Sequence, residues 1–457
     1  MKKGLRITLI VVSSFLLALL LFLLFAVVNH SVRNSVKVDE KIENTTGLVV
    51  AKGRGLYDED GNKLILKGVN LGNLFVTEGW ISPYATYDME WNSDSNHYDY
   101  KELSHEQFLK GFNSNPNLND NERRELLEIY YENFFNDLDA KFIKSIGFNC
   151  IRIPFYYKNI LDENDGVFTL KDEVSAFKDL DRVVNICSDN DLYVVLDLHG
   201  CPGSQNGYEH SGAIDYDKYN KDTIRFWYND TYIDAIVDLW KYVSNHYKDN
   251  KTIAMYDLIN EPRSRKLVSD KTVWNVYDKI YKVIRENGDN HNIALEGIWS
   301  FSRLPNPKKY SWENVTYSYH FYNWFTGKGL SNNMFYTYQD LSNFGRNYEV
   351  PVYIGEFTFF DDEKSWKTGL KLYDERHYSW TLWTYKMPVE GSWWTNSWGI
   401  INLYNYDDEA SKGWHKVNVS TATYDEIKAC FLATNLSNTS SIKYSNTYKF
   451  LKDYFDK

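Results

Sequence analysis

Residues 253–262 read IAMYDLINEP, an apolar run that ends in an amide, a carboxylate and a proline. A short apolar run of this kind is typical of a buried parallel strand. Pro262 disfavours helical dihedrals at Glu261, so we expect the chain to stay extended up to the acid. In barrels of parallel strands, the chemistry lies at the C-terminal ends of the strands. The stretch therefore predicts a barrel strand that carries Glu261 into an active site.

A second glutamate ends another apolar run, because residues 352–357 read VYIGEF. Two strand-end carboxylates far apart in the sequence suit a glycosidase, which needs two carboxylates across one sugar bond. The two stretches therefore predict Glu261 and Glu356 as the catalytic pair.

Working outward, strand-like runs alternate with segments of helical apolar spacing. Strands that alternate with helices imply parallel βαβ units, and eight of them imply a closed barrel. The sequence thus predicts an α/β fold, a (β/α)8 TIM barrel. The expected helices cover residues 121–146, 177–190, 223–247 and 272–287. The expected strands lie at residues 64–70, 148–155, 192–198, from 253, 293–296, 314–320, 352–355 and 378–383.

Three segments flank these elements. Residues 56–64 contain a Gly turn between two short runs, which predicts a hairpin that leads into the first strand. The long loop at 71–119 is expected to be functional, since loops of that length inside a domain usually are. The tail after about residue 405 contains possible helices at 422–431 and 444–455 but is too short for a second domain. We therefore expect one catalytic domain over residues 49–457.

The N-terminus carries basic residues ahead of an uncharged run at residues 7–28. This run is long enough to span a bilayer and exceeds the apolar core of a signal peptide. It predicts an uncleaved signal-anchor at residues 1–28, followed by a polar stem at 29–48. The catalytic domain would then lie outside the cytoplasm at the cell membrane, or be secreted if the segment is cleaved.

Composition limits the partners. The net charge of −11 argues against nucleic-acid binding, because phosphates require a basic face. The 15 Trp and 37 Tyr suit both core packing and stacking on sugar rings. The sequence has no metal-binding motif and predicts no metal or cofactor. The four cysteines are expected to be buried free thiols, with a disulfide as the alternative; they are Cys150, Cys187, Cys201 and Cys430.

Further candidates come at or just after the expected strand ends. Arg152 could keep a neighbouring carboxylate ionised or form a structural ion pair. His199 could bond a sugar hydroxyl, and Asn260 could hold the sugar 2-hydroxyl.

Two strands near the end of the barrel add aromatic and imidazole groups. His320 and Tyr322 follow the sixth strand, where the tyrosine hydroxyl could orient Glu356. Trp383 ends the eighth strand and could form a stacking floor for a sugar ring, or could be part of the core.

Together these signatures resemble glycoside hydrolase family 5, the cellulase-like barrels, over roughly residues 56–400. The resemblance implies that Glu261 is the acid/base, that Glu356 is the nucleophile and that the anomeric configuration is retained. The matching stretches are NCIRIP at 149–154, LHG at 198–200, NEP at 260–262, HFY at 320–322, GEF at 355–357, and Trp383.

Three stretches look like the exo-β-1,3-glucanase branch of that family: residues 67–73, 78–81 and 199–207. That branch usually has a tryptophan after the nucleophile, whereas Phe357 stands here, as in bacterial endoglucanases. The linkage and the mode of cleavage, endo or exo, therefore stay open. A loop with Trp393, Trp394 and Trp398 is either a sugar subsite or a packed loop.

The expected protein is a membrane-anchored retaining hydrolase of a β-glucan, either cellulose-like or β-1,3-linked. A β-mannanase or a transglycosylase of the same family is the alternative among enzymes. A catalytically silent glycan-binding barrel is the alternative outside them, and the presence of both glutamates, Arg152 and Asn260 disfavours it.

Overall fold

The chain was analysed as a computed structural model. It describes residues 11–24, 27, 37–43, 46–86, 91–92, 97–98, 103–213, 224–262, 268–297, 303–322, 334–335, 348–388, 398–403, 416–440 and 442–456.

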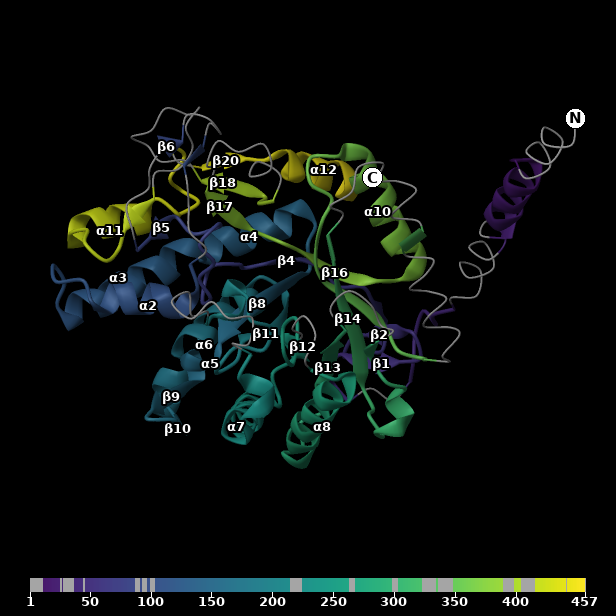
Figure 1. Cartoon of the computed structure of the whole chain (residues 1–457), viewed down its shortest axis with the longest axis horizontal. Coiled ribbons are helices and arrows are strands. Elements are labelled where there is room, and N and C mark those ends of the chain that lie inside the picture. Colours follow the sequence, from purple (N-terminus) through teal and green to yellow (C-terminus); the bar gives the residue numbers. More distant parts are fainter. Residues whose placement is uncertain are drawn as a thin grey trace, which may run out of the picture.

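Eight parallel strands close into a barrel in chain order, with β16 returning to pair with β4. This confirms the predicted (β/α)8 barrel (Figure 1). The barrel strands are β4 (Lys67–Asn70), β8 (Cys150–Tyr156), β11 (Tyr193–Gly200), β12 (Ile253–Asp257), β13 (Asn292–Glu296), β14 (Val315–Tyr322), β15 (Val352–Thr358) and β16 (Ser379–Leu382).

The strands form where the sequence is continuously apolar. Every residue of β8 and of β12 is buried, as expected for parallel strands that are covered by helices on one side and by the barrel interior on the other. Besides the helical residues 11–24, the labelled α-helices are α2 (His105–Asn113), α3 (Asp120–Phe134), α4 (Asp137–Ile146), α5 (Tyr157–Ile160), α6 (Glu173–Asp189), α7 (Asp230–Tyr247), α8 (Asp270–Glu286), α10 (Glu363–Arg376), α11 (Tyr424–Leu432) and α12 (Asn446–Phe455).

A small apolar cluster fills one end of the barrel. Val49, Leu56 and Leu66 come from the N-terminal segment and pack against barrel residues such as Val195 and Met255. The segment contains β1 (Val50–Lys52), β2 (Gly55–Tyr57) and β3 (Lys63–Leu64), so the predicted hairpin is present. The hairpin closes the N-terminal end of the barrel, which leaves the C-terminal ends of the strands for a site.

Two predicted segments differ from the structure. The helix expected at 121–146 is two helices, because Phe135 is extended and Asn136 caps α4 in a capping box with Asp139. The loop expected at 71–119 contains α2, which begins with a capping box between Ser104 and Gln107. In both places a polar residue with a suitable partner three residues later starts a helix.

The C-terminal tail packs on the outside of the barrel. Phe431 of α11 contacts Tyr84 and Tyr130, and Phe455 of α12 contacts Phe148. Its helices match the two expected there. Short strands complete the described structure: β5 (Tyr84–Ala85), β6 (Trp91–Asn92), β7 (His97–Tyr98), β9 (Leu161–Asn164), β10 (Val167–Leu170), β17 (Lys386–Pro388), β18 (Ile401–Leu403), β19 (Val417–Asn418) and β20 (Ile442–Tyr444).

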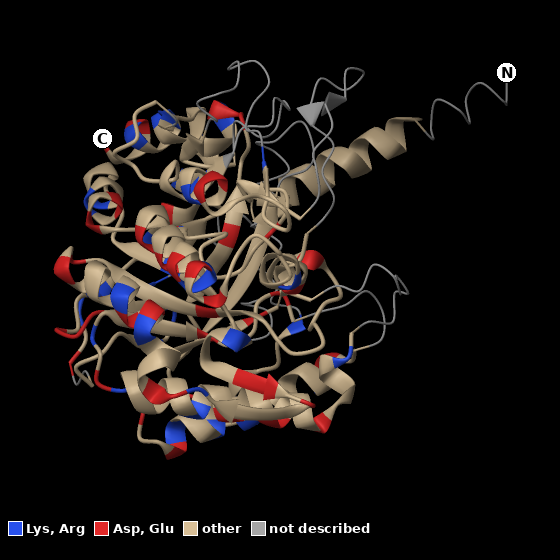
Figure 2. Cartoon of the chain, turned by 90° about the vertical axis from the view of Figure 1, so that its left-hand side faces the viewer, with Lys and Arg blue, Asp and Glu red and all other residues tan. Residues whose placement is uncertain are grey.

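The predicted membrane-spanning segment is not supported. Residues 11–24 are helical, and none of the helices in the described part of the chain is long and apolar enough to cross a bilayer. All four cysteines are buried free thiols, which confirms that prediction over the disulfide. On the side of the molecule in Figure 2, acidic residues are mixed with basic ones along the helices.

Candidate active site

Two glutamates meet at the C-terminal end of the barrel. Glu356 lies within β15, and Glu261 lies in the short segment that follows β12. His320 of β14 connects them, because its Nδ1 lies 2.9 Å from Glu261 Oε1 and 3.4 Å from Glu356 Oε2. The structure thus brings together three of the predicted residues from β14, β15 and the segment that follows β12.

Glu356 is held on both oxygens. Arg152 Nη1 donates to Oε1 at 2.9 Å, and the Tyr322 hydroxyl donates to Oε2 at 2.6 Å. Burial alone would raise the pKa of Glu356, but the neighbouring His320 and Arg152 outweigh it and lower that pKa. The carboxyl group is therefore ionised at neutral pH, with Arg152 and Tyr322 in the contacts predicted for them.

Glu261 differs from the prediction in its backbone. Its φ is 40°, in the left-handed region, whereas Pro262 predicted an extended conformation. The cause is a tertiary contact: the Glu261 amide donates to Glu296 Oε2 at 2.7 Å. This hydrogen bond compensates for the less favourable dihedral.

The carboxyl of Glu261 lies between two imidazoles. Its Oε2 is 3.0 Å from His210 Nε2, and its Oε1 is the oxygen that faces His320. Burial would raise the pKa of Glu261, but interactions with His210 and then His320 lower it well below its usual range. The same pairing raises the pKa of His210 to about 10, although burial opposes this.

Arg152 lies inside β8 rather than at its end, and its side chain is a buried hub, that is, a centre of several hydrogen bonds and ion pairs. It donates to Asp257, to the Asn260 side chain at 2.8 Å and to the Asn70 side chain at 2.9 Å. Burial would lower its pKa, but Asp197, Asp257 and Glu356 raise it well above the usual value. Arg152 therefore pairs with Glu356 and also with two further buried carboxylates, Asp197 and Asp257.

His199 and Trp383 stack on each other beside this hub, with ring centroids 5.5 Å apart and planes 11° apart. Trp383 is only 2% exposed and packs against Ile81 and Met387. His199 Nδ1 lies 2.7 Å from Asp197 Oδ2. The predicted sugar-stacking role of Trp383 stays a prediction.

The tryptophan loop lies only partly within the described residues. Trp398 packs edge to face on Trp80, with ring centroids 4.8 Å apart, and its ring centroid lies 5.4 Å from that of Tyr322. Trp393 and Trp394 lie outside the described residues. Trp80 in turn donates to the buried Glu78 at 2.7 Å.

Several residues of the site were not among the predicted ones. Asp197, Asp257 and Glu296 each stand near the end of a barrel strand, so the signal that identified Glu356 could have found them. His210 comes from the short 3-10 helix η1 (Glu209–Ser211) in the loop after β11, and no sequence signal marked it. Glu78 lies in the stretch 78–81, which resembles the exo-β-1,3-glucanase branch, but the sequence predicted no function for its carboxyl group.

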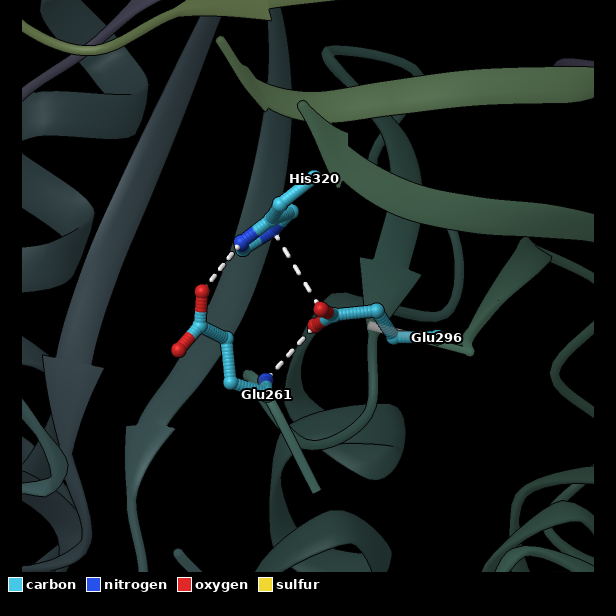
Figure 3. Close-up of side chains that lie close together, drawn as sticks. All are labelled: Glu261, Glu296 and His320. Carbon is cyan, nitrogen blue, oxygen red and sulfur yellow. Dashed lines mark hydrogen bonds and ion pairs between the residues drawn. The ribbon is translucent and has the colours of Figure 1, made fainter. Parts of the chain in front are cut away.

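Figure 3 shows Glu261, Glu296 and His320 pointing toward one another. Their ligand-type atoms all lie within 4.8 Å of one another, a spacing that a divalent cation could use. Hydrogen bonds and ion pairs among the three side chains and the Glu261 amide account for the arrangement.

Comparisons with known proteins agree with this geometry. The family model described as cellulase (glycosyl hydrolase family 5) matches residues 109–387, which include every predicted site residue. The chain is 30% identical over 367 residues to a β-xylosidase of Phanerodontia chrysosporium, across 73% of this chain and 70% of that protein. It is 27% identical over 310 residues to a probable glucan 1,3-beta-glucosidase A of Neosartorya fischeri, across 66% of each chain.

A structural comparison gives the same fold. A crystal structure of endogalactoceramidase superposes with a TM-score of 0.51 at 15% identity, across 74% of each chain. At that identity the likeness concerns the barrel alone.

Proposed function

We propose, from the premise that this chain belongs to the cellulase family, glycosyl hydrolase family 5, that it hydrolyses the β-glycosidic bonds of a β-glucan with retention of configuration. One observation carries the proposal, namely the position of His320 between the two glutamates. Because both oxygens contact the same His320 nitrogen, Glu261 Oε1 and Glu356 Oε2 lie no more than about 6.3 Å apart, which supports two carboxyl groups that act on one bond. Retaining enzymes need about 5–5.5 Å.

Glu356 acts as the nucleophile in this proposal. Its carboxylate attacks the anomeric carbon, and the bond from that carbon to the glycosidic oxygen breaks. Arg152 and Tyr322 support this role because they hold the carboxylate ionised and oriented.

Glu261 acts as the acid and then as the base. It gives a proton to the leaving oxygen, and it later takes one from the water that releases the sugar from Glu356. His210, at 3.0 Å, favours the ionised form in the resting site, so the acid step draws on a proton that can pass between His210 and Glu261. After the first step Glu356 is esterified, and the ionised Glu261 is ready to act as base.

His199, Asn260 and Trp383 are proposed to bind the sugar. Arg152 orients the Asn260 side chain, which supports the assignment of that amide to the sugar 2-hydroxyl. The relatives named as glucan 1,3-beta-glucosidases favour a β-1,3-glucan, and the relative named as a β-xylosidase makes a β-xyloside the second candidate.

NMR of the first-formed product tests the mechanism. We expect the β-anomer to appear first from a laminari-oligosaccharide, before mutarotation. An α-anomer as the first product would overturn the retaining mechanism. Rates on laminarin, lichenan, cellulose, mannan and aryl β-xylosides would then rank the substrates, and no hydrolysis of any would favour the silent glycan-binding barrel.

We also propose that the catalytic domain works outside the cytoplasm, as the apolar run at residues 7–28 predicts. Hydrolysis of an added polysaccharide by intact cells, without lysis, would agree with this location. Activity that appears only after lysis would contradict it.

A further inference from the structure

Glu296 ends β13 beside Glu261 and His320, and its carboxyl group is fully buried. A buried carboxyl group is costly unless both oxygens have partners. Each of its oxygens faces a different part of the proposed machinery, as Figure 3 shows.

The first oxygen fixes a backbone. Glu296 Oε2 accepts the 2.7 Å hydrogen bond from the amide of Glu261, whose φ of 40° is rare for a residue with a side chain. This bond therefore determines the direction in which the Glu261 side chain leaves the chain. Without it, the extended conformation that Pro262 favours would compete.

The second oxygen faces an imidazole. Glu296 Oε1 lies 3.5 Å from His320 Nε2, and neither atom has another hydrogen-bond partner among the described residues, although both are buried. Such a pair is stable only if one proton lies between the two atoms. Burial and the nearby Asp257 and Glu261 raise the pKa of Glu296 well above its usual range, which supplies that proton.

The direction of this hydrogen bond determines the other side of the ring. If the protonated Glu296 carboxyl donates to Nε2, then Nε2 is the acceptor, and the Nδ1 atom of the imidazole carries the N–H that points at Glu261 and Glu356. His320 Nδ1 is the atom that lies within reach of both carboxylates.

We propose that Glu296 is a positioning residue for the catalytic pair: it clamps the backbone of Glu261 and, through a proton shared with His320 Nε2, keeps the N–H of His320 directed at Glu261 and Glu356. The inference rests on the proposed function and extends it to a third carboxyl group that touches no substrate.

Two substitutions test this role, one that keeps both contacts and one that removes them. Glu296→Gln keeps an oxygen for the Glu261 amide and an N–H for His320, so we expect kcat/KM within about threefold of wild type. Glu296→Leu removes both contacts at similar volume. Because general acid catalysis contributes roughly 10²–10⁴-fold, we expect kcat/KM to fall about a hundredfold or more on aryl glycosides with poor leaving groups.

The dependence on the leaving group distinguishes positioning from folding. With 2,4-dinitrophenyl glycosides, which need no proton, Glu296→Leu should lose less than about tenfold. A loss that is equal across all leaving groups would overturn the proposal, as would a Gln variant that behaves like the Leu variant. If Glu296→Leu does not fold, nitrogen NMR of His320 in the wild type decides: a protonated Nδ1 supports the proposal, and a bare Nδ1 overturns it.

A matched control is available just before the start of the same strand. Asp289 is another buried carboxylate that contacts a histidine, with Oδ1 at 2.7 Å from His291 Nδ1. Asp289→Asn should lower the melting temperature but leave the leaving-group dependence unchanged. Failure of the proposed function would be recognised separately, since the wild type would then hydrolyse no aryl glycoside.

Discussion

At the scale of single residues, the two glutamates share His320 but differ in every other partner. Glu356 has a permanent cation, Arg152, and a tyrosine hydroxyl. Glu261 has His210, a group that can give up its proton. This difference supports different roles, because a nucleophile must stay ionised whereas an acid/base must exchange a proton twice.

Substituting each glutamate should reveal the two roles. Glu356→Ala should be almost inactive on every substrate, and azide should restore turnover with a product of inverted configuration. Glu261→Ala should keep glycosylation on aryl glycosides whose leaving group needs no proton, and azide should give the retained glycosyl azide. NMR of the azide products measures both outcomes, and the opposite pattern would exchange the two assignments.

His199 predicts a pH dependence of stability. Burial alone would lower its pKa, but Asp197 raises the pKa of His199 to about 9, above the roughly 6.5 of an unfolded chain. Because the folded pKa is the higher one, the stabilisation is complete below about pH 6.5 and is lost as the pH rises through about 9. Melting temperatures from pH 6 to 10 should fall less in His199→Gln than in the wild type, and parallel curves would contradict the assignment.

At the scale of elements, capping residues decide where the outer helices begin. The apolar spacing continues through Phe135, and yet the helix breaks there, because Asn136 accepts from the Leu138 amide and Asp139 accepts from the Asn136 amide. The spacing of apolar residues alone could not reveal this break, because the spacing is the same on both sides of it.

The cap of α4 gives a prediction of its own. Asn136→Ala should lower the free energy of unfolding by about 1 kcal/mol, because an N-cap hydrogen bond is lost. Urea unfolding measures the change. Ser145→Ala in the same helix is the control and should change stability by less than about 0.5 kcal/mol. Equal effects of the two substitutions would mean that the cap does not define the helix start.

At the scale of the whole molecule, the two ends of the barrel have different tasks. The N-terminal end is closed by the apolar cluster around Leu56, whereas the C-terminal end carries the carboxylates, the imidazoles and Trp383. Stability and chemistry are thus separated along the barrel axis.

Paired substitutions test that separation. Leu56→Ala should cost about 2–5 kcal/mol of stability through the cavity that it leaves, with kcat/KM of the folded enzyme unchanged. Trp383→Ala should lower kcat/KM by about one to two decades through lost stacking. Thermal melts and steady-state kinetics on both variants provide the data; reduced kcat/KM in Leu56→Ala, or unchanged kcat/KM in Trp383→Ala, would show that the ends are not separate.

The sequence by itself determined the barrel and predicted which two glutamates lie together at its C-terminal end. Both depend on local patterns: apolar runs of strand length, and a carboxylate where each run stops. Glu261 and Glu356 could be singled out because Glu261 follows one strand and Glu356 lies near the end of another, and the ends of parallel strands meet at one edge of the barrel.

Only the tertiary structure decided how the pair is held and charged. The left-handed backbone of Glu261 depends on Glu296, which lies on the next strand, and its low pKa depends on His210, which a loop brings from before α7. Local patterning predicted an extended backbone at Glu261 and contained no signal for the histidine beside its carboxyl group. Interactions between residues distant in sequence decided both features, because in a buried site the nearest charges and donors outweigh local preference.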